Sequence, residues 1–109
     1  MREPGYQSIT PRELKERLER GDRPELLDVR ELWEFELSRI EGSRLIPLQE
    51  LPQRASELDP EREIVVICHH GARSAYVTQA LDRSGFHSVL NLEGGLDAYS
   101  RVDERVPRY

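Results

Sequence analysis

Cys68 is the only cysteine in the 109-residue chain, and its neighbours suit a reactive thiol. It directly follows four apolar residues, Ile64-Val65-Val66-Ile67, and precedes the segment His69-His70-Gly71-Ala72-Arg73. A thiolate is a strong nucleophile, and nearby cations or inward-facing backbone N–H groups stabilise it. A lone cysteine cannot form an internal disulfide, so the sequence leaves two interpretations, a nucleophile or a small buried side chain.

The residues after Cys68 predict a loop that surrounds its sulfur atom. A helix is expected over Ser74–Ser84, so residues 68–73 form the turn from a buried strand into a helix. Such a turn aims several N–H groups at one point, and the helix dipole adds to their field. Gly71 permits a backbone conformation that other residues resist. With two histidines and Arg73 adding positive character, we expect Cys68 to be a reactive thiolate near neutral pH.

The paired histidines also suggest a metal site. Adjacent residues rarely supply a complete ligand set, and no second cysteine or ligand cluster follows them in the sequence. The sequence therefore predicts no metal here. The candidate site is Cys68 with the loop residues His69, His70, Gly71, Ala72 and Arg73.

Arg73 has two possible roles beside Cys68. It can contact a bound anion, or it can hold the loop by pairing with an acid such as Asp28, and the structural role is favoured. Asp28 and Arg30 are expected to be structural supports near the loop. Glu93-Gly94-Gly95 is expected to shape a strand-to-helix turn.

Strand and helix patterns alternate along the chain and must position this loop. Strands are expected at residues 6–9, 25–29, 45–46, 64–67 and 88–92. Helices are expected from Thr10 to a stop at Gly21, and at residues 31–37, 48–58, 74–84 and 95–100. Because the run 64–67 does not alternate with polar residues, it predicts a strand buried on both faces. The sequence thus predicts an α/β domain with a mainly parallel central sheet and helices on both faces.

Composition limits the function classes. One domain over residues 1–109 fits the length, and the net charge of −5 argues against a broad nucleic-acid interface. No stretch approaches the roughly 18 apolar residues of a membrane span, and the first ten residues lack the apolar core of a secretion signal. We therefore expect a cytoplasmic protein that binds neither nucleic acid nor membrane. Residues 101–109 are expected to be a solvated tail, and Trp33, Phe35 and Tyr99 to be packing residues.

Several short motifs occur in order along almost the whole chain. They are Leu26-Leu27-Asp28-Val29-Arg30 with Trp33-Glu34, Ile40-Glu41-Gly42-Ser43 with Ile46-Pro47, the loop segment 66–74, Gly85-Phe86 with Val89, and the segment 91–99. Together they resemble the rhodanese family. Many relatives carry Arg directly after the cysteine, where this sequence has His69, a weaker and pH-dependent cation.

The resemblance implies a sulfurtransferase. A sulfane-sulfur donor such as thiosulfate would load Cys68 as a persulfide, and a nucleophile such as cyanide, a thiol or a partner protein would remove the sulfur. The resemblance implies no metal or organic cofactor. It also leaves open a non-catalytic binding or sulfur-delivery module of the same fold.

Two other functions fit a reactive cysteine less well. Cysteine-based phosphatases place five residues between cysteine and arginine, whereas four lie between Cys68 and Arg73. A redox sensor usually has a resolving cysteine, and this chain has none.

Overall fold

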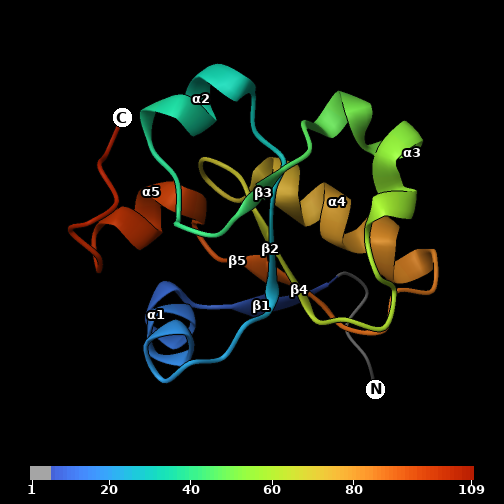
Figure 1. The fold of residues 1–109 in the computed structure, drawn as a ribbon, viewed down its shortest axis with the longest axis horizontal. Helices are drawn as coiled ribbons and strands as arrows, with labels where there is room; N and C mark the ends of the chain where they lie inside the picture. Colours follow the sequence, from blue (N-terminus) through green and yellow to red (C-terminus); the bar gives the residue numbers. More distant parts are fainter. Residues whose placement is uncertain (1–5) are drawn as a thin grey trace.

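A five-stranded sheet forms the centre of the protein, whose structure is a computed structural model that describes residues 6–109. Its strands lie in the order β1-β5-β4-β2-β3, and every neighbouring pair is parallel. The predicted parallel sheet is therefore confirmed, with β4 in the middle (Figure 1). The strands are β1 (Gln7–Ile9), β2 (Glu25–Asp28), β3 (Arg44–Leu45), β4 (Ile64–Ile67) and β5 (Val89–Leu92).

Helices follow most of the strands. They are α1 (Pro11–Glu19), α2 (Leu32–Leu37), α3 (Leu51–Arg54), α4 (Ala72–Arg83) and α5 (Gly95–Ser100), with short 3₁₀ helices at Leu48–Glu50 and Ala55–Glu57. The predicted start of α1 is confirmed, because Thr10 and Glu13 bond each other's backbone N–H groups in a capping box. No helix in the described part of the chain is long and apolar enough to cross a membrane.

One predicted helix is wrong in its extent. The segment 48–58 is divided into a 3₁₀ turn, the four-residue α3 and a second 3₁₀ turn. Pro52 explains the first break, between the 3₁₀ turn and α3, because proline has no N–H group to donate to the carbonyl four residues earlier.

Residues of β4 alternate between two hydrophobic cores. Ile64 and Val66 belong to the core beneath α4, whereas Val65 and Ile67 belong to the core beneath α1 and α5. All four side chains are fully buried, so helices cover both faces of the sheet as predicted. Cys68 continues the alternation on the α4 side, and its sulfur therefore faces the start of that helix.

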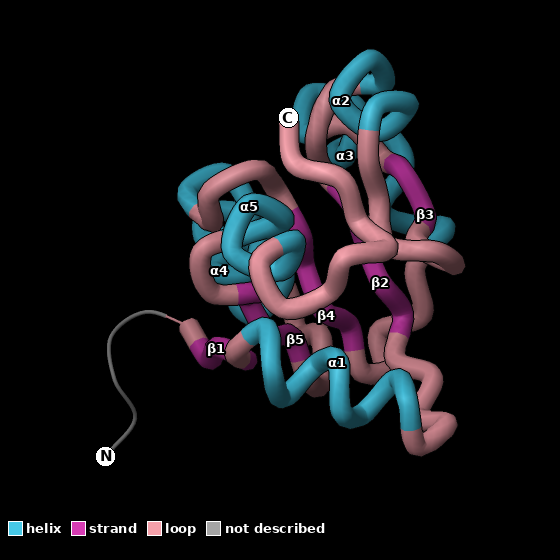
Figure 2. Tube along the Cα trace, turned by 90° about the vertical axis from the view of Figure 1, so that its left-hand side faces the viewer, coloured by secondary structure: helices cyan, strands magenta, loops and turns pink. Residues whose placement is uncertain are grey.

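The segment after α5 is not a solvated tail. Asp103 and Val106 are buried, and Val106 packs into the core beneath α1 and α5. The Ser38 hydroxyl donates to the carbonyl of Pro107 at 2.5 Å. The chain thus returns from α5 to α2, beside which its C-terminus lies (Figures 1 and 2). Charged residues made residues 101–109 resemble a free tail, but the buried Asp103 and Val106 fix the segment to the domain.

The three predicted packing aromatics behave differently. Tyr99 is buried in the core, as predicted, and Phe35 is half-buried under the Arg39 guanidinium. Trp33 is 60% exposed, so the prediction for this residue is wrong. Its ring meets the Tyr109 ring edge to face, and the buried residue of α2 is Glu34.

Candidate active site

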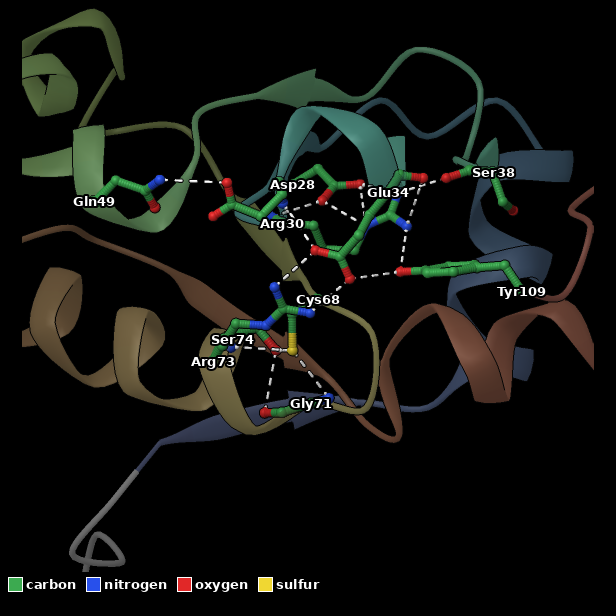
Figure 3. A network of polar contacts seen from close by, with 11 residues as sticks. Asp28, Arg30, Glu34, Ser38, Gln49, Cys68, Gly71, Arg73, Ser74 and Tyr109 are labelled. Atoms are coloured by element: carbon green, nitrogen blue, oxygen red, sulfur yellow. Dashed lines mark hydrogen bonds and ion pairs between the residues drawn. The ribbon is translucent and has the colours of Figure 1, made fainter. Parts of the chain in front are cut away.

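Cys68 lies at the carboxyl end of β4, and three groups from Gly71 and from Ser74 in the first turn of α4 surround its sulfur (Figure 3). The backbone N–H groups of Gly71 and Ser74 donate to Sγ at 3.0 and 3.3 Å. The Ser74 hydroxyl lies 3.2 Å from the same sulfur. The residue is only 1% exposed. Donors that converge on one sulfur atom favour its anionic form, so this arrangement can hold a thiolate or a persulfide anion.

The start of α5 turns the carbonyl groups of the loop away from the sulfur. Leu96 and Asp97 donate their N–H groups to the carbonyls of Cys68 and His69 at 2.7 and 2.9 Å. A Cβ atom at Gly95 would come within 2.5 Å of both carbonyl oxygens, so only glycine fits there. The predicted role of the segment 93–95 in shaping a turn is confirmed. With the carbonyls bonded to α5, the N–H groups of the loop remain free to face Cys68.

Gly71 is the point at which the loop becomes a helix. Its φ of 103° is in the left-handed region, and it is the residue immediately before α4. The helix begins at Ala72, two residues earlier than the predicted start at Ser74. The left-handed conformation of Gly71 turns the chain within one residue, so that the helix begins at the next residue, Ala72. Ala72 is exposed in the first turn, and Arg73 belongs to the helix instead of the loop.

Arg73 is paired with an acid, which is Glu34 and not Asp28, the example that the sequence offered. Its guanidinium donates to both carboxylate oxygens of Glu34 on α2, at 2.8 and 2.9 Å. This contact lowers the pKa of Glu34 to about 2, burial acting in the opposite direction. The same hydrogen bonds raise the pKa of Arg73 above its ordinary value. Asp28 is not the partner of Arg73 because Asp28 already has a cationic partner.

That partner is Arg30, two residues along the chain. The Arg30 Nε atom lies 2.9 Å from Asp28 Oδ1, and its terminal nitrogen lies 2.8 Å from Oδ2. Both side chains are fully buried. A charge in the core needs further partners, and Arg30 also donates to the backbone carbonyls of Glu34 and Ser38. The pair thus ties the end of β2 to α2, a geometry that suits the structural role expected for Asp28 and Arg30.

The two histidines contribute less charge than expected. Burial, and repulsion from His70, lower the pKa of His69. The His69 ring lies between the rings of His70 and Tyr109, at centroid distances of 4.0 and 4.4 Å. Since Arg73 is neutralised by Glu34, the site holds little unpaired positive charge. His70 is exposed at the edge of the loop.

Asp97 lies beside these two histidines in the folded chain. Ligand atoms of His69, His70 and Asp97 all lie within 4.8 Å of one another, so they are the described residues best placed to hold a metal ion. Spacing along the chain does not reveal this group, because Asp97 lies far from the histidines in sequence. Arg101 already pairs with Asp97 at 3.2 Å, and this cation competes with a metal for the carboxylate.

The site also contains three residues that the sequence patterns did not select. Ser74 contacts the sulfur, Glu34 holds Arg73, and the Tyr109 hydroxyl contacts both Arg30 and Glu34 (Figure 3). Glu34 and Ser74 lie within the motifs that suggested the family, so the resemblance was an available signal for them. No local pattern pointed to Tyr109.

Known proteins resemble the chain in both sequence and structure. A sulfurtransferase of Allochromatium vinosum is 33% identical over 93 residues, which cover 85% of this chain and 87% of that protein. The rhodanese-like/PpiC domain-containing protein 12 of Arabidopsis thaliana is 40% identical over 93 residues, but the match spans only 31% of its length. A rhodanese-related protein of Thermoplasma volcanium superposes with a TM-score of 0.84 at 31% identity, covering 94% of this chain and 98% of that chain.

The match extends across the fold and includes the loop at Cys68. A family model for the rhodanese-like domain covers residues 10–101, from the cap of α1 to the end of α5. This range contains the whole turn from β4 to α4. The chain therefore belongs to the rhodanese-like domain family.

Proposed function

We propose that the protein is a sulfurtransferase that carries sulfur as a persulfide on Cys68. The observation that carries this proposal is the pair of N–H groups, from Gly71 and Ser74, directed at the cysteine sulfur. Relatives named as sulfurtransferases support the reaction class. The thiol is 1% exposed, so sulfur exchange requires a transient opening around the loop.

The reaction divides into two balanced half-reactions. In the first, the Cys68 thiolate attacks the outer sulfur of a donor such as thiosulfate. The S–S bond of the donor breaks, sulfite leaves with the bonding pair, and Cys68 becomes a persulfide anion. In the second, an acceptor such as cyanide or a thiolate attacks the terminal sulfur, and the Cys68 thiolate is released. The N–H groups of Gly71 and Ser74 can stabilise the anionic sulfur before loading and after transfer.

The charges around the loop bear on the choice of donor. Arg73 is paired with Glu34, Arg30 is paired with Asp28, and the pKa of His69 is lowered. Among these three residues, none offers an unpaired positive charge to bind thiosulfate, which is a dianion. A small thiol persulfide, which carries one negative charge, needs less compensation. We therefore expect faster loading from a small persulfide than from thiosulfate at equal concentration.

Intact-protein mass spectrometry tests the proposal. Incubation with thiosulfate or with a small persulfide should add the mass of one sulfur atom, and a reducing thiol or cyanide should remove it. Cys68→Ser is the matched control, and it should fold normally while losing both the adduct and turnover. A wild-type protein that takes up no sulfur from either donor would support the non-catalytic binding module instead.

A further inference from the structure

The hydroxyl of Tyr109 joins the two ion pairs that surround the active site. It accepts a hydrogen bond from Arg30 at 2.7 Å and donates one to Glu34 at 3.0 Å (Figure 3). Arg30 belongs to the buried pair with Asp28, whereas Glu34 holds Arg73 beside the loop. Burial raises the pKa of Tyr109 to about 12, so its proton remains available to donate to Glu34 at neutral pH.

The segment after α5 holds this tyrosine in place. Val106 is buried in the core, and the next carbonyl, that of Pro107, accepts the hydroxyl of Ser38. Asp103 is buried and bonds both the backbone and the guanidinium of Arg105. These contacts fix the chain just before Tyr109.

The ring of Tyr109 also contacts the loop. Its centroid lies 4.4 Å from that of His69, the residue after the nucleophile, and 6.4 Å from that of Trp33 on α2. The Arg30 guanidinium lies 5.4 Å from the same ring. Tyr109 therefore contacts α2, the connection from β2 to α2 at Arg30, and the Cys68 loop through separate parts of one side chain.

We propose that Tyr109 is a positioning residue, which acts on Cys68 through Glu34 and Arg73 to keep the cationic side of the sulfur site in place. This inference rests on the proposed function, since it assigns Tyr109 a part in holding the sulfur anion. The path has three steps: a hydrogen bond from the phenol to Glu34, the ion pair from Glu34 to Arg73, and the charge of Arg73 acting on the sulfur.

The Tyr109 hydroxyl acts on the site by holding the Glu34 carboxylate in place. One of its oxygens accepts from the Glu31 backbone and Arg73, and the other accepts from Arg73 and Tyr109. Loss of the phenol would leave the second oxygen with Arg73 alone. Because the Arg73 side chain is 35% exposed, water then competes for the ion pair, and Arg73 is held less firmly beside Cys68.

The test compares the full chain with Y109F, Y109A and E34Q. Y76F is the matched control, because Tyr76 is 68% exposed on α4 and outside the network. The first readout is the rate of Cys68 alkylation by iodoacetamide as a function of pH, which requires no sulfur transfer. The charged and titratable groups facing this part of the site are Arg73, Glu34, Tyr109, Arg30 with its partner Asp28, His69, His70 and Asp97. The second readout is the KM and kcat of persulfide loading.

We expect Y109F to move the alkylation profile to higher pH and to slow alkylation at neutral pH by about two- to fivefold. This is smaller than the full effect of one hydrogen bond to a charged group, because the lost bond acts on the sulfur only through Glu34 and Arg73. E34Q, which removes the anion that neutralises Arg73, should not shift the profile to higher pH as Y109F does, and Y76F should match the wild type. The thermal transition of Y109F should remain within a few degrees of the wild type, since its ring still packs on His69.

Identical alkylation profiles for Y109F and the wild type would overturn the proposal, whatever Y109A does to folding. If the profile shifts but the wild type takes up no sulfur, the positioning role stands and the proposed sulfurtransferase function fails. If every variant takes up sulfur and no profile shifts, the positioning role fails and the proposed sulfurtransferase function stands.

Discussion

Arg73 and Glu34 form a two-point ion pair across 39 residues of sequence, with nitrogen–oxygen distances of 2.8 and 2.9 Å. One partner lies in the first turn of α4, directly after the Cys68 loop, and the other lies on α2. Glu34 also accepts the backbone N–H of Glu31, so the cap of α2 and the site share one carboxylate. The shape of the Cys68 loop, which follows β4, therefore depends on α2, which follows β2.

Replacing Glu34 by glutamine should weaken folding and change the rate of sulfur loading. The variant keeps the side-chain shape but leaves Arg73 without its anion, and we expect a loss of about 1 to 2 kcal/mol in the free energy of unfolding, reduced by the partial exposure of Arg73. Urea denaturation measures this loss. Glu57→Gln, which breaks an exposed pair with Arg54, is the control and should change stability and sulfur loading little. Equal effects of the two substitutions would contradict the special role of Glu34.

Acid should destabilise the protein through Glu34. Its pKa in the folded protein is about 2, against an ordinary value of 4.5, so the folded state holds the carboxylate deprotonated where the unfolded chain binds a proton. The stabilisation is complete above about pH 4.5 and is lost as the pH falls toward about pH 2. Denaturation curves over this range should show a shallower pH dependence for E34Q than for the wild type. Parallel curves for the two proteins would show that Glu34 is not the titrating group.

Gly71→Ala should disable the sulfur site more than it destabilises the fold. Alanine at a φ of 103° is strained by about 1 to 2 kcal/mol, and its Cβ atom would lie 3.3 Å from the backbone nitrogen of Gly94. Relief of this strain would rotate the N–H group that now points at Cys68. We expect alkylation of Cys68 to slow about tenfold or more at neutral pH, the scale set by activating a thiol.

Gly21→Ala provides the control for this substitution. Gly21 has a similar φ of 99°, but nothing lies within 4 Å of an added Cβ atom, and it follows α1. It should lose comparable stability and keep full Cys68 reactivity. If the two variants react at the same rate, the Gly71 N–H group does not activate the sulfur.

The protein should not hydrolyse aryl phosphates. The loop places four residues between Cys68 and Arg73, and both guanidinium arms of Arg73 are occupied by Glu34. A phosphoryl group would find no free arginine fork to bind its oxygens. A chromogenic aryl phosphate should show no turnover above the Cys68→Ser background. Turnover on the order of 1 per second or faster would contradict this expectation.

Local patterns in the sequence were sufficient for much of the fold. The apolar run of β4 predicted a strand buried on both faces, and the Thr10 and Glu13 pair predicted the start of α1. These features depend on hydrogen bonds and side-chain periodicity within a few residues, which a sequence displays directly. The position of Cys68 after a buried strand, and the glycine that follows it, likewise located the candidate site.

Only the tertiary structure decided which side chains meet there. Asp28 and Glu34 were both available acids for Arg73, and packing gave Asp28 to Arg30 and Glu34 to Arg73. Tyr109 reaches Glu34 across 75 residues because Val106 is buried and directs the last residues toward α2. Partners so distant in sequence are chosen by the packing of whole elements, and neither charge nor spacing along the chain distinguishes among them.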